Sequence, residues 1–232
     1  RRGHWDGKKH YISGTGVFRT GLLDRVLGDL EKIECVPDLE WKQQSQKKVP
    51  IKSVGDFSYY TFQKSLIETA LTKKRGIIKS PTASGKTLIE AGIIKSLVEH
   101  RPRKMIMLFN AKHLLTQTFE FFTKACNIKN VGLCFGEGFI YGDIMLCTVQ
   151  SIDKILDTHL EEAEVLMVDE VHEFGNGKRT LAAVKAFPKA DYRIGLTATP
   201  PTDDIPKFNL EGAFGPIWVE ATTSGLVEEG KL

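Results

Sequence analysis

Residues 80–87 have the types and spacing of a loop that binds phosphate groups. The segment reads Ser80-Pro81-Thr82-Ala83-Ser84-Gly85-Lys86-Thr87. Small residues such as Ser84 and Gly85 let backbone N–H groups turn toward a phosphate chain, and the N-terminus of a following helix adds its dipole. We expect Lys86 to reach the β- and γ-phosphates of a nucleotide and Thr87 to offer its hydroxyl to Mg²⁺. Ser80 stands where the usual motif has its first glycine.

A second polar segment, Asp169-Glu170-Val171-His172, comes directly after the apolar run Val165–Val168. The carboxyl end of a buried parallel strand is where α/β sheets bind ligands. Asp169 is therefore expected to hold Mg²⁺, usually through water, and Glu170 to orient or deprotonate an attacking water. A plain surface loop is one alternative. A zinc site on His172 is another, and it is disfavoured because no second His or Cys has a ligand spacing to it.

The third segment, Thr197-Ala198-Thr199-Pro200, also follows an apolar run. Taken alone, it is most simply a strand that exits into a proline turn. The order along the chain gives it more weight, because a phosphate loop and an acidic strand end precede it. We therefore expect His172, Thr197 and Thr199 to couple the nucleotide site to a neighbouring surface.

The elements that must position these residues alternate between strand and helix. Helical patterns run over Thr87–His100 and Leu114–Ala125. Alternation of apolar strands with helices predicts the α/β fold class, with a parallel sheet covered by helices on both faces. The predicted strands are Gly76–Lys79, Met105–Phe109, Val131–Phe135, Ile144–Val149, Val165–Val168 and Arg193–Leu196.

The chain also divides into a small first unit and a larger lobe. Asp6-Gly7 predicts a hairpin turn, and apolar residues between Leu22 and Leu30 recur at helical spacing. The polar stretch from Trp41 to Lys52 is typical of a linker. We therefore predict a small, basic α+β accessory unit with its linker over residues 1–52, and an α/β lobe over residues 53–232.

Composition excludes several classes of protein. Of the 232 residues, 41% are hydrophobic and 26% are charged, which is ordinary for a globular chain. No apolar run is long enough to cross a bilayer and no secretory leader opens the chain, so no membrane partner is expected. Four cysteines without a CxxC pair favour a reducing, cytoplasmic compartment. The first residue is Arg1, which suggests a fragment or a processed chain.

The net charge of +3 hides an uneven distribution. Residues 1–129 hold 24 Lys and Arg against 12 Asp and Glu, whereas residues 130–232 hold 8 against 17. A basic front half is compatible with a polyanionic partner such as nucleic acid. An unevenly charged solubilising surface explains the same numbers about equally well.

The order of the three motifs resembles the superfamily 2 helicases and translocases of the DExH group, over most of residues 57–232. Phe62-Gln63-Lys64 is similar to their Tyr-Gln-Lys element, with Phe62 in place of the usual Tyr. This likeness implies that Gln63 reads adenine through its amide. The resemblance also implies a RecA-like fold for the lobe and ATP with Mg²⁺ as cofactors.

Two further segments, Asn110–Gln117 and Thr148–Ser151, are similar to the motifs with which this family contacts nucleic-acid backbones. The likeness implies that Lys112, Thr148 and Gln150 bind DNA. The DNA would be branched, duplex or single-stranded, and such contacts depend on phosphates rather than on base sequence.

Within this group the chain resembles the phage branch-migration helicases of the UvsW type. Trp5-Asp6-Gly7-Lys8 and Gly21-Leu22-Leu23 resemble their small N-terminal unit. The likeness implies DNA-stimulated ATP hydrolysis in recombination, repair or replication, in the host cytoplasm if the chain is phage-encoded. It also implies a second RecA-like lobe that is missing here, so that this chain alone is expected to be inactive.

Two other function classes stay open at this point. A P-loop kinase or transferase would share the phosphate loop, but no lid-like arginine cluster accompanies it in the sequence. A nucleotide- and DNA-binding module that never hydrolyses ATP would share all the motifs. An intact Glu170 counts against the second class for the parent protein.

Overall fold

The computed structural model describes residues 12–13, 17–35, 37, 48–81, 84–155, 162–175, 182 and 186–219. The hairpin predicted at Asp6-Gly7, most of the predicted linker and the segment 220–232 lie outside these residues. All six predicted strands are present within the described ranges.

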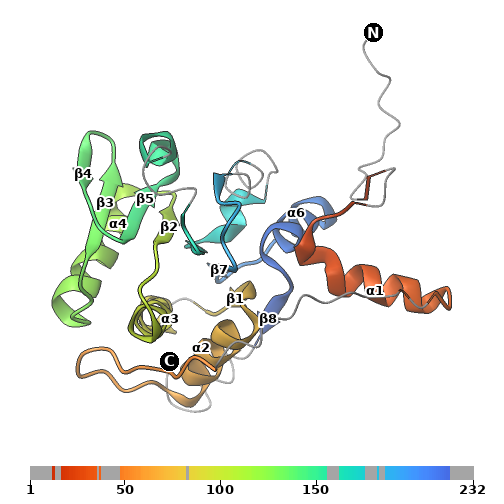
Figure 1. Cartoon of the computed structure of the whole chain (residues 1–232), viewed down its shortest axis with the longest axis horizontal. Coiled ribbons are helices and arrows are strands. Elements are labelled where there is room, and N and C mark those ends of the chain that lie inside the picture. The colour runs from red at the N-terminus through yellow and green to blue at the C-terminus, as the bar shows by residue number, and fades with distance from the viewer. Residues whose placement is uncertain are drawn as a thin grey trace, which may run out of the picture.

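Eight strands form one sheet in the order β4-β3-β5-β2-β6-β7-β1-β8 (Figure 1). Neighbouring strands are parallel except for the antiparallel pair of β3 and β4 at one edge. The predicted α/β fold class is therefore confirmed. The strands are β1 (Arg75–Lys79), β2 (Met105–Phe109), β3 (Val131–Phe135), β4 (Gly138–Ile140), β5 (Ile144–Thr148), β6 (Val165–Val168), β7 (Tyr192–Thr197) and β8 (Ile217–Val219).

Both predicted helical patterns form helices, with shifted ends. The first begins at Lys86, and the second begins at Lys112 and turns from α- to π-helical at Phe121. The helices within the described ranges include η1 (Thr20–Leu22), α1 (Leu23–Lys32), α2 (Thr61–Lys73), α3 (Lys86–His100), α4 (Lys112–Glu120), η2 (Phe121–Ala125), η3 (Val149–Ile155), η4 (Val171–Phe174) and α6 (Asp204–Phe214).

Alternation along the strands produces two hydrophobic cores, one on each face of the sheet. On β2, Met107 and Phe109 belong to the core that α2, α3 and α4 cover, whereas Ile106 and Leu108 belong to the core that α6 covers. Each central strand is therefore apolar on both sides. Only the strand ends are left to carry polar side chains that face solvent or a ligand.

The helix predicted between Leu22 and Leu30 is η1 followed by α1, and it docks on α6 (Figure 1). Leu22 is 3% exposed. Arg25 pairs with Glu211 at 2.7 Å, and its guanidinium carbon lies 4.1 Å from the centre of the Phe208 ring. Val49 is part of the core on the α2 and α3 face, although it precedes residue 53.

No helix within the described ranges is long and apolar enough to span a bilayer. The four cysteines are free thiols, and three of them are buried.

Candidate functional site

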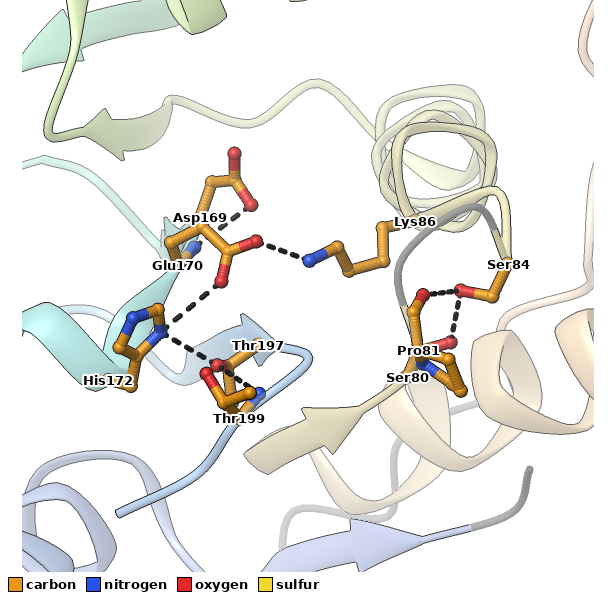
Figure 2. Close-up of polar contacts among 9 residues, drawn as sticks. All are labelled: Ser80, Pro81, Ser84, Lys86, Asp169, Glu170, His172, Thr197 and Thr199. Atoms are coloured by element: carbon orange, nitrogen blue, oxygen red, sulfur yellow. Dashed lines mark hydrogen bonds and ion pairs between the residues drawn. The ribbon is translucent and has the colours of Figure 1, made fainter. Parts of the chain in front are cut away.

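The loop after β1 is closed by its own serine side chains (Figure 2). Ser84 Oγ donates to the carbonyl oxygen of Pro81 at 2.6 Å, and it lies 2.6 Å from Ser80 Oγ. Because the single hydroxyl proton of Ser84 is donated to Pro81, the hydroxyl of Ser80 must be the donor in the hydrogen bond between the two serines. Ser80, which replaces the usual glycine, is fully buried, and its hydroxyl stabilises the loop from the inside.

Gly85 is the point at which the loop turns into α3. Its φ of +77° is in the left-handed region, and a Cβ there would lie 2.5 Å from Gln63 Nε2. The left-handed φ favours glycine, and any larger residue would also have to displace the Gln63 amide. The next residue, Lys86, begins α3, so the free backbone N–H groups of the helix N-terminus face the loop, as a phosphate-binding site requires.

Lys86 connects the loop to the acidic end of β6. Its ammonium group forms an ion pair with Glu170 Oε1, and the two side chains are 15% and 27% exposed (Figure 2). Glu170 has a φ of +47°, in the left-handed region that costs a non-glycine residue roughly 1–2 kcal/mol. This backbone conformation accompanies a side chain that reaches both Lys86 and His172.

Asp169 lies at the carboxyl end of β6, as predicted. Its Oδ1 accepts the backbone N–H of Glu170 at 2.9 Å, and its own N–H bonds to Leu108 in β2. Burial raises the pKa of Asp169, the nearby Glu170 raises it further, and Lys86 lowers it. The site thus disfavours a second bare negative charge and would be stabilised by a cation.

His172 ties the end of β6 to the end of β7 (Figure 2). Its Nδ1 lies 2.8 Å from Thr197 Oγ1 and 3.2 Å from Glu170 Oε2. Thr197 Oγ1 also accepts the backbone N–H of Thr199 at 3.1 Å. The three residues expected to couple the site to its surroundings therefore form one chain of contacts that starts at Glu170.

These side chains fit a Mg²⁺ ion that a nucleotide brings with it. Among the described residues no group of three or more His, Cys, Asp or Glu could hold a metal by itself. Mg²⁺ is usually bound by one or two protein oxygens and completed by phosphates and water. Asp169 and the hydroxyl of Thr87, in the first turn of α3, supply the chemistry that such an ion needs.

Gln63 lies beside the phosphate loop rather than on an open surface. It is 2% exposed, its Oε1 accepts the backbone N–H of Tyr60 at 3.0 Å, and its Nε2 donates to the carbonyl of Ser84 at 2.8 Å. The amide therefore holds the start of α2 against the loop. The rings of Tyr60 and Phe62 stack nearby with centroids 6.0 Å apart. Adenine recognition by Gln63 stays a prediction.

Sequence reasoning missed Glu90, which is 1% exposed in α3. Its Oε1 is buried and has no hydrogen-bond partner among the described residues. Burial raises the pKa of Glu90 well above its ordinary value, Asp169 raises it further, and Lys86 acts in the opposite direction. The signal in the sequence is a lone acidic residue within the apolar run from Leu88 to Ile94, one helical turn after Lys86.

The three residues expected to bind DNA line one hollow at the same edge of the sheet. Lys112, Thr148 and Gln150 stand at or beyond the carboxyl ends of β2 and β5. Gln150 is exposed, whereas Thr148 is 6% exposed and donates to Ser151 Oγ at 3.0 Å. The Thr148 hydroxyl thus stabilises the wall of the hollow.

The hollow has further lining residues that the motifs did not indicate. Lys154 bonds to the carbonyl oxygen of Gly136, and the Lys112 ammonium lies 4.5 Å from the centre of the Phe135 ring. Both amide atoms of Asn110 are buried without a hydrogen-bond partner in the described part of the chain. The lining of the hollow therefore includes two lysines, one acidic residue, Glu137, and an aromatic ring.

Comparison with known proteins agrees with this geometry. A family model described as the res subunit of type III restriction enzymes matches residues 51–202. The ATP-dependent DNA helicase UvsW of Enterobacteria phage T4 is 22% identical, over all of this chain and 50% of its own length. The DNA 3'-5' translocase XPB2 of Sulfurisphaera tokodaii is 29% identical over 76% of this chain and 39% of its own. The chain thus spans half or less of the length of these relatives.

Solved structures show the same fold. The crystal structure of the UvsW helicase from bacteriophage T4 matches with a TM-score of 0.78 at 17% identity, over 94% of this chain and 85% of that one. The Sulfolobus solfataricus SWI2/SNF2 ATPase core in complex with dsDNA matches with a TM-score of 0.56 at 21% identity, over 74% and 38%. The chain therefore belongs to the ResIII family, whose model is described as the res subunit of type III restriction enzymes, and its motifs resemble those of the superfamily 2 helicases.

Proposed function

We propose that this chain binds Mg·ATP and is the first RecA-like lobe of an ATP-dependent DNA helicase or translocase that remodels branched DNA. The observation that carries the proposal is the chain of contacts from Lys86 through Glu170 and His172 to Thr197. It joins the phosphate loop to two neighbouring strand ends in a single polar site.

ATP binding uses groups that the loop already orients. The N-terminus of α3 and Ser84, Gly85, Lys86 and Thr87 receive the phosphate chain. Lys86 exchanges Glu170 for the β- and γ-phosphate oxygens, since a phosphate oxygen offers the ammonium a comparable charge-assisted hydrogen bond. Gln63, which touches both the loop and the start of α2, reads the base from the side of α2.

Hydrolysis then depends on the two carboxylates at the end of β6. Mg²⁺, when bound, neutralises charge on the phosphates. Asp169 and Thr87 hold that ion, and Glu170 positions the attacking water once Lys86 has turned to the phosphates. His172 holds the Glu170 carboxylate in the site. Because His172 also contacts Thr197, a movement of Glu170 is transmitted to Thr197 and Thr199.

DNA lies in the hollow that Lys112 and Lys154 face. Ammonium groups bind phosphates without regard to base sequence. The hollow and the nucleotide site both use the carboxyl ends of parallel strands, so the two ligands are bound at one edge of the sheet. Residues 1–52 are proposed as an accessory unit that adds DNA contacts. The free cysteines support action in a reducing cytoplasm.

The proposal is tested by binding. Because the chain spans half of the UvsW relative, the first measurement is affinity for a fluorescent ATP analogue, with Lys86→Ala as the variant and Lys124→Ala as the surface control. ATP hydrolysis is then measured with no nucleic acid, single-stranded DNA, a four-way junction and RNA. Binding that needs Mg²⁺ and Lys86, with tighter binding to the junction than to RNA, supports the proposal.

Three outcomes would contradict it. Nucleotide binding that is indifferent to Lys86→Ala would remove the assignment of the site. Preference for RNA would place the chain with relatives such as the chloroplast DExH15 RNA helicase of Arabidopsis thaliana, which is 30% identical over 63% of this chain and 14% of its own length. Transfer of the labelled γ-phosphate to an acceptor other than water would favour a kinase.

A further inference from the structure

Glu90 is a buried acidic residue that the proposed mechanism does not use. It is 1% exposed, and the residues that flank it, Ile89 and Ala91, are fully buried. A carboxyl group in such a place loses its hydration, and burial is tolerated only when other groups replace the lost hydrogen bonds. Among the described residues none does so for Glu90 Oε1. Packing alone would be served better by an apolar side chain of similar size.

The position of Glu90 indicates which ligand could supply the hydrogen bonds that its carboxyl group has lost. Residues four apart lie on the same face of a helix, so Glu90 is directly behind Lys86 on α3. Helical side chains lean toward the N-terminus of their helix, which for α3 is the phosphate loop. The charges that act on Glu90 are those of Asp169, Lys86 and Glu170, the three ionisable groups of the nucleotide site.

A hydrated cation beside Asp169 would bring the missing donors. Mg²⁺ in nucleotide sites keeps several water molecules, and the hydrogens of these waters point away from the ion. Groups that accept from such waters orient the metal and strengthen its binding without touching it. Asp169 is suited to hold the ion, and an orphaned acceptor oxygen nearby matches what its waters require.

We propose that Glu90 is a positioning residue for the Mg²⁺ of the nucleotide site, accepting a hydrogen bond from a metal-bound water through its buried carboxyl oxygen. The inference rests on the proposed function, because it requires Mg·ATP at this site. It adds a third acidic side chain, from α3, to the two that β6 supplies.

The test compares nucleotide affinity with and without the metal. Affinity for a fluorescent ATP analogue is measured in excess Mg²⁺ and in EDTA, for the wild-type chain and for Glu90→Met, Glu90→Gln and Glu99→Gln. Met fills the site without an acceptor, and Gln keeps a neutral acceptor oxygen. Glu99 lies on the same helix, is exposed and pairs with Lys95, so it controls for loss of an acidic charge from α3.

The expected readout is the ratio of the two affinities. Glu90→Met should lower this ratio about 10-fold, the lower end of what loss of an outer-shell partner costs. It should leave the EDTA affinity unchanged, because without Mg²⁺ there is no metal-bound water for Glu90 to accept from. Glu90→Gln should change the ratio in the same direction but less, and Glu99→Gln should not change it.

The opposite pattern would overturn the inference. If Glu90 only supports the fold, both affinities fall together in Glu90→Met and the ratio stays at the wild-type value. An unchanged ratio in a Glu90→Met protein that unfolds at the wild-type temperature would also overturn it. Failure of the wild-type chain itself to bind Mg·ATP would instead contradict the proposed function.

Discussion

Lys86 joins the phosphate loop to the end of β6. Its substitution should affect nucleotide binding much more than folding. We expect Lys86→Ala to weaken nucleotide binding about 10- to 100-fold, since a hydrogen bond to a charged group contributes about 1.5–3 kcal/mol. The thermal midpoint should change little, because the ion pair with Glu170 is partly exposed. Titration with a fluorescent nucleotide and thermal unfolding check the two expectations. Lys124→Ala, on an exposed side chain of η2, should match the wild type in both.

Glu170, the partner of Lys86 in this ion pair, is expected to act in hydrolysis rather than in nucleotide binding. Glu170→Gln keeps the shape of the side chain but cannot take a proton, so hydrolysis by the proposed ATPase should slow by roughly 10²–10⁴. Nucleotide affinity should stay within a few-fold of wild type. Steady-state hydrolysis and nucleotide titration on the same preparation separate the two effects. Loss of binding together with turnover would make Glu170 a metal ligand or a structural residue.

At the residue scale, motifs predict what a single segment contains and miss what folding brings together. The residue types of Lys86, Asp169 and Glu170 are enough by themselves to indicate phosphate and metal chemistry. The direct contact between Lys86 and Glu170 joins residues 84 positions apart, which no local pattern encodes. The sequence marks Glu90 only as a lone acidic residue in an apolar run, and an acidic residue on a helix is usually exposed, so its burial is seen only once α3 packs against α2 and the sheet.

At the element scale, the predictable strands are those with uninterrupted apolar runs. β2, β3 and β6 have the predicted bounds, because each apolar run is followed by a polar residue or a glycine. α2 and α6 were not predicted, since α2 mixes polar and apolar residues with little periodicity and α6 carries Pro206 in its first turn. β4 and β8, with three residues each, are too short to give a pattern.

The docking of α1 on α6 is an element-scale contact that a point change should loosen. Arg25→Ala removes both the ion pair with Glu211 and the cation–π contact with Phe208. Partly exposed contacts of these two kinds contribute together about 1 kcal/mol. Backbone amides of α1 should therefore exchange with deuterium about fivefold faster, while nucleotide affinity at Lys86 is unchanged.

The same helix supplies a matched control for that measurement. Lys32 pairs with Asp29 of its own helix, and both side chains are more than half exposed. Lys32→Ala should leave exchange in α1 near wild type. Equal exchange rates for Arg25→Ala and Lys32→Ala would mean that Leu22 and the rest of the apolar contact hold α1 alone.

At the scale of the whole molecule, the fold brings charged residues of the basic and acidic halves of the sequence together. The phosphate loop comes from the basic half of the sequence and the acidic strand end from the other half, and Lys86 pairs them. The two lysines of the hollow, Lys112 and Lys154, also come one from each half. Much of the surplus in the front half is therefore not explained by the nucleotide site.

Part of that surplus is at the start of the chain, where it can be removed without touching any described residue. Deleting residues 1–11 removes Arg1, Arg2, Lys8 and Lys9 with Asp6, a loss of three net positive charges. If these residues bind DNA phosphates, the slope of log affinity against log salt becomes shallower by about 0.7 per lost contact on single strands and about 0.9 on duplex. A full-length variant with the four basic residues changed to Gln should reproduce the effect, because the counterions released depend on charge and not on chain length. Affinity for the ATP analogue should be the same in all three proteins. Equal salt slopes for the wild type and both variants would mean that these four side chains are solvated and contact no DNA phosphate.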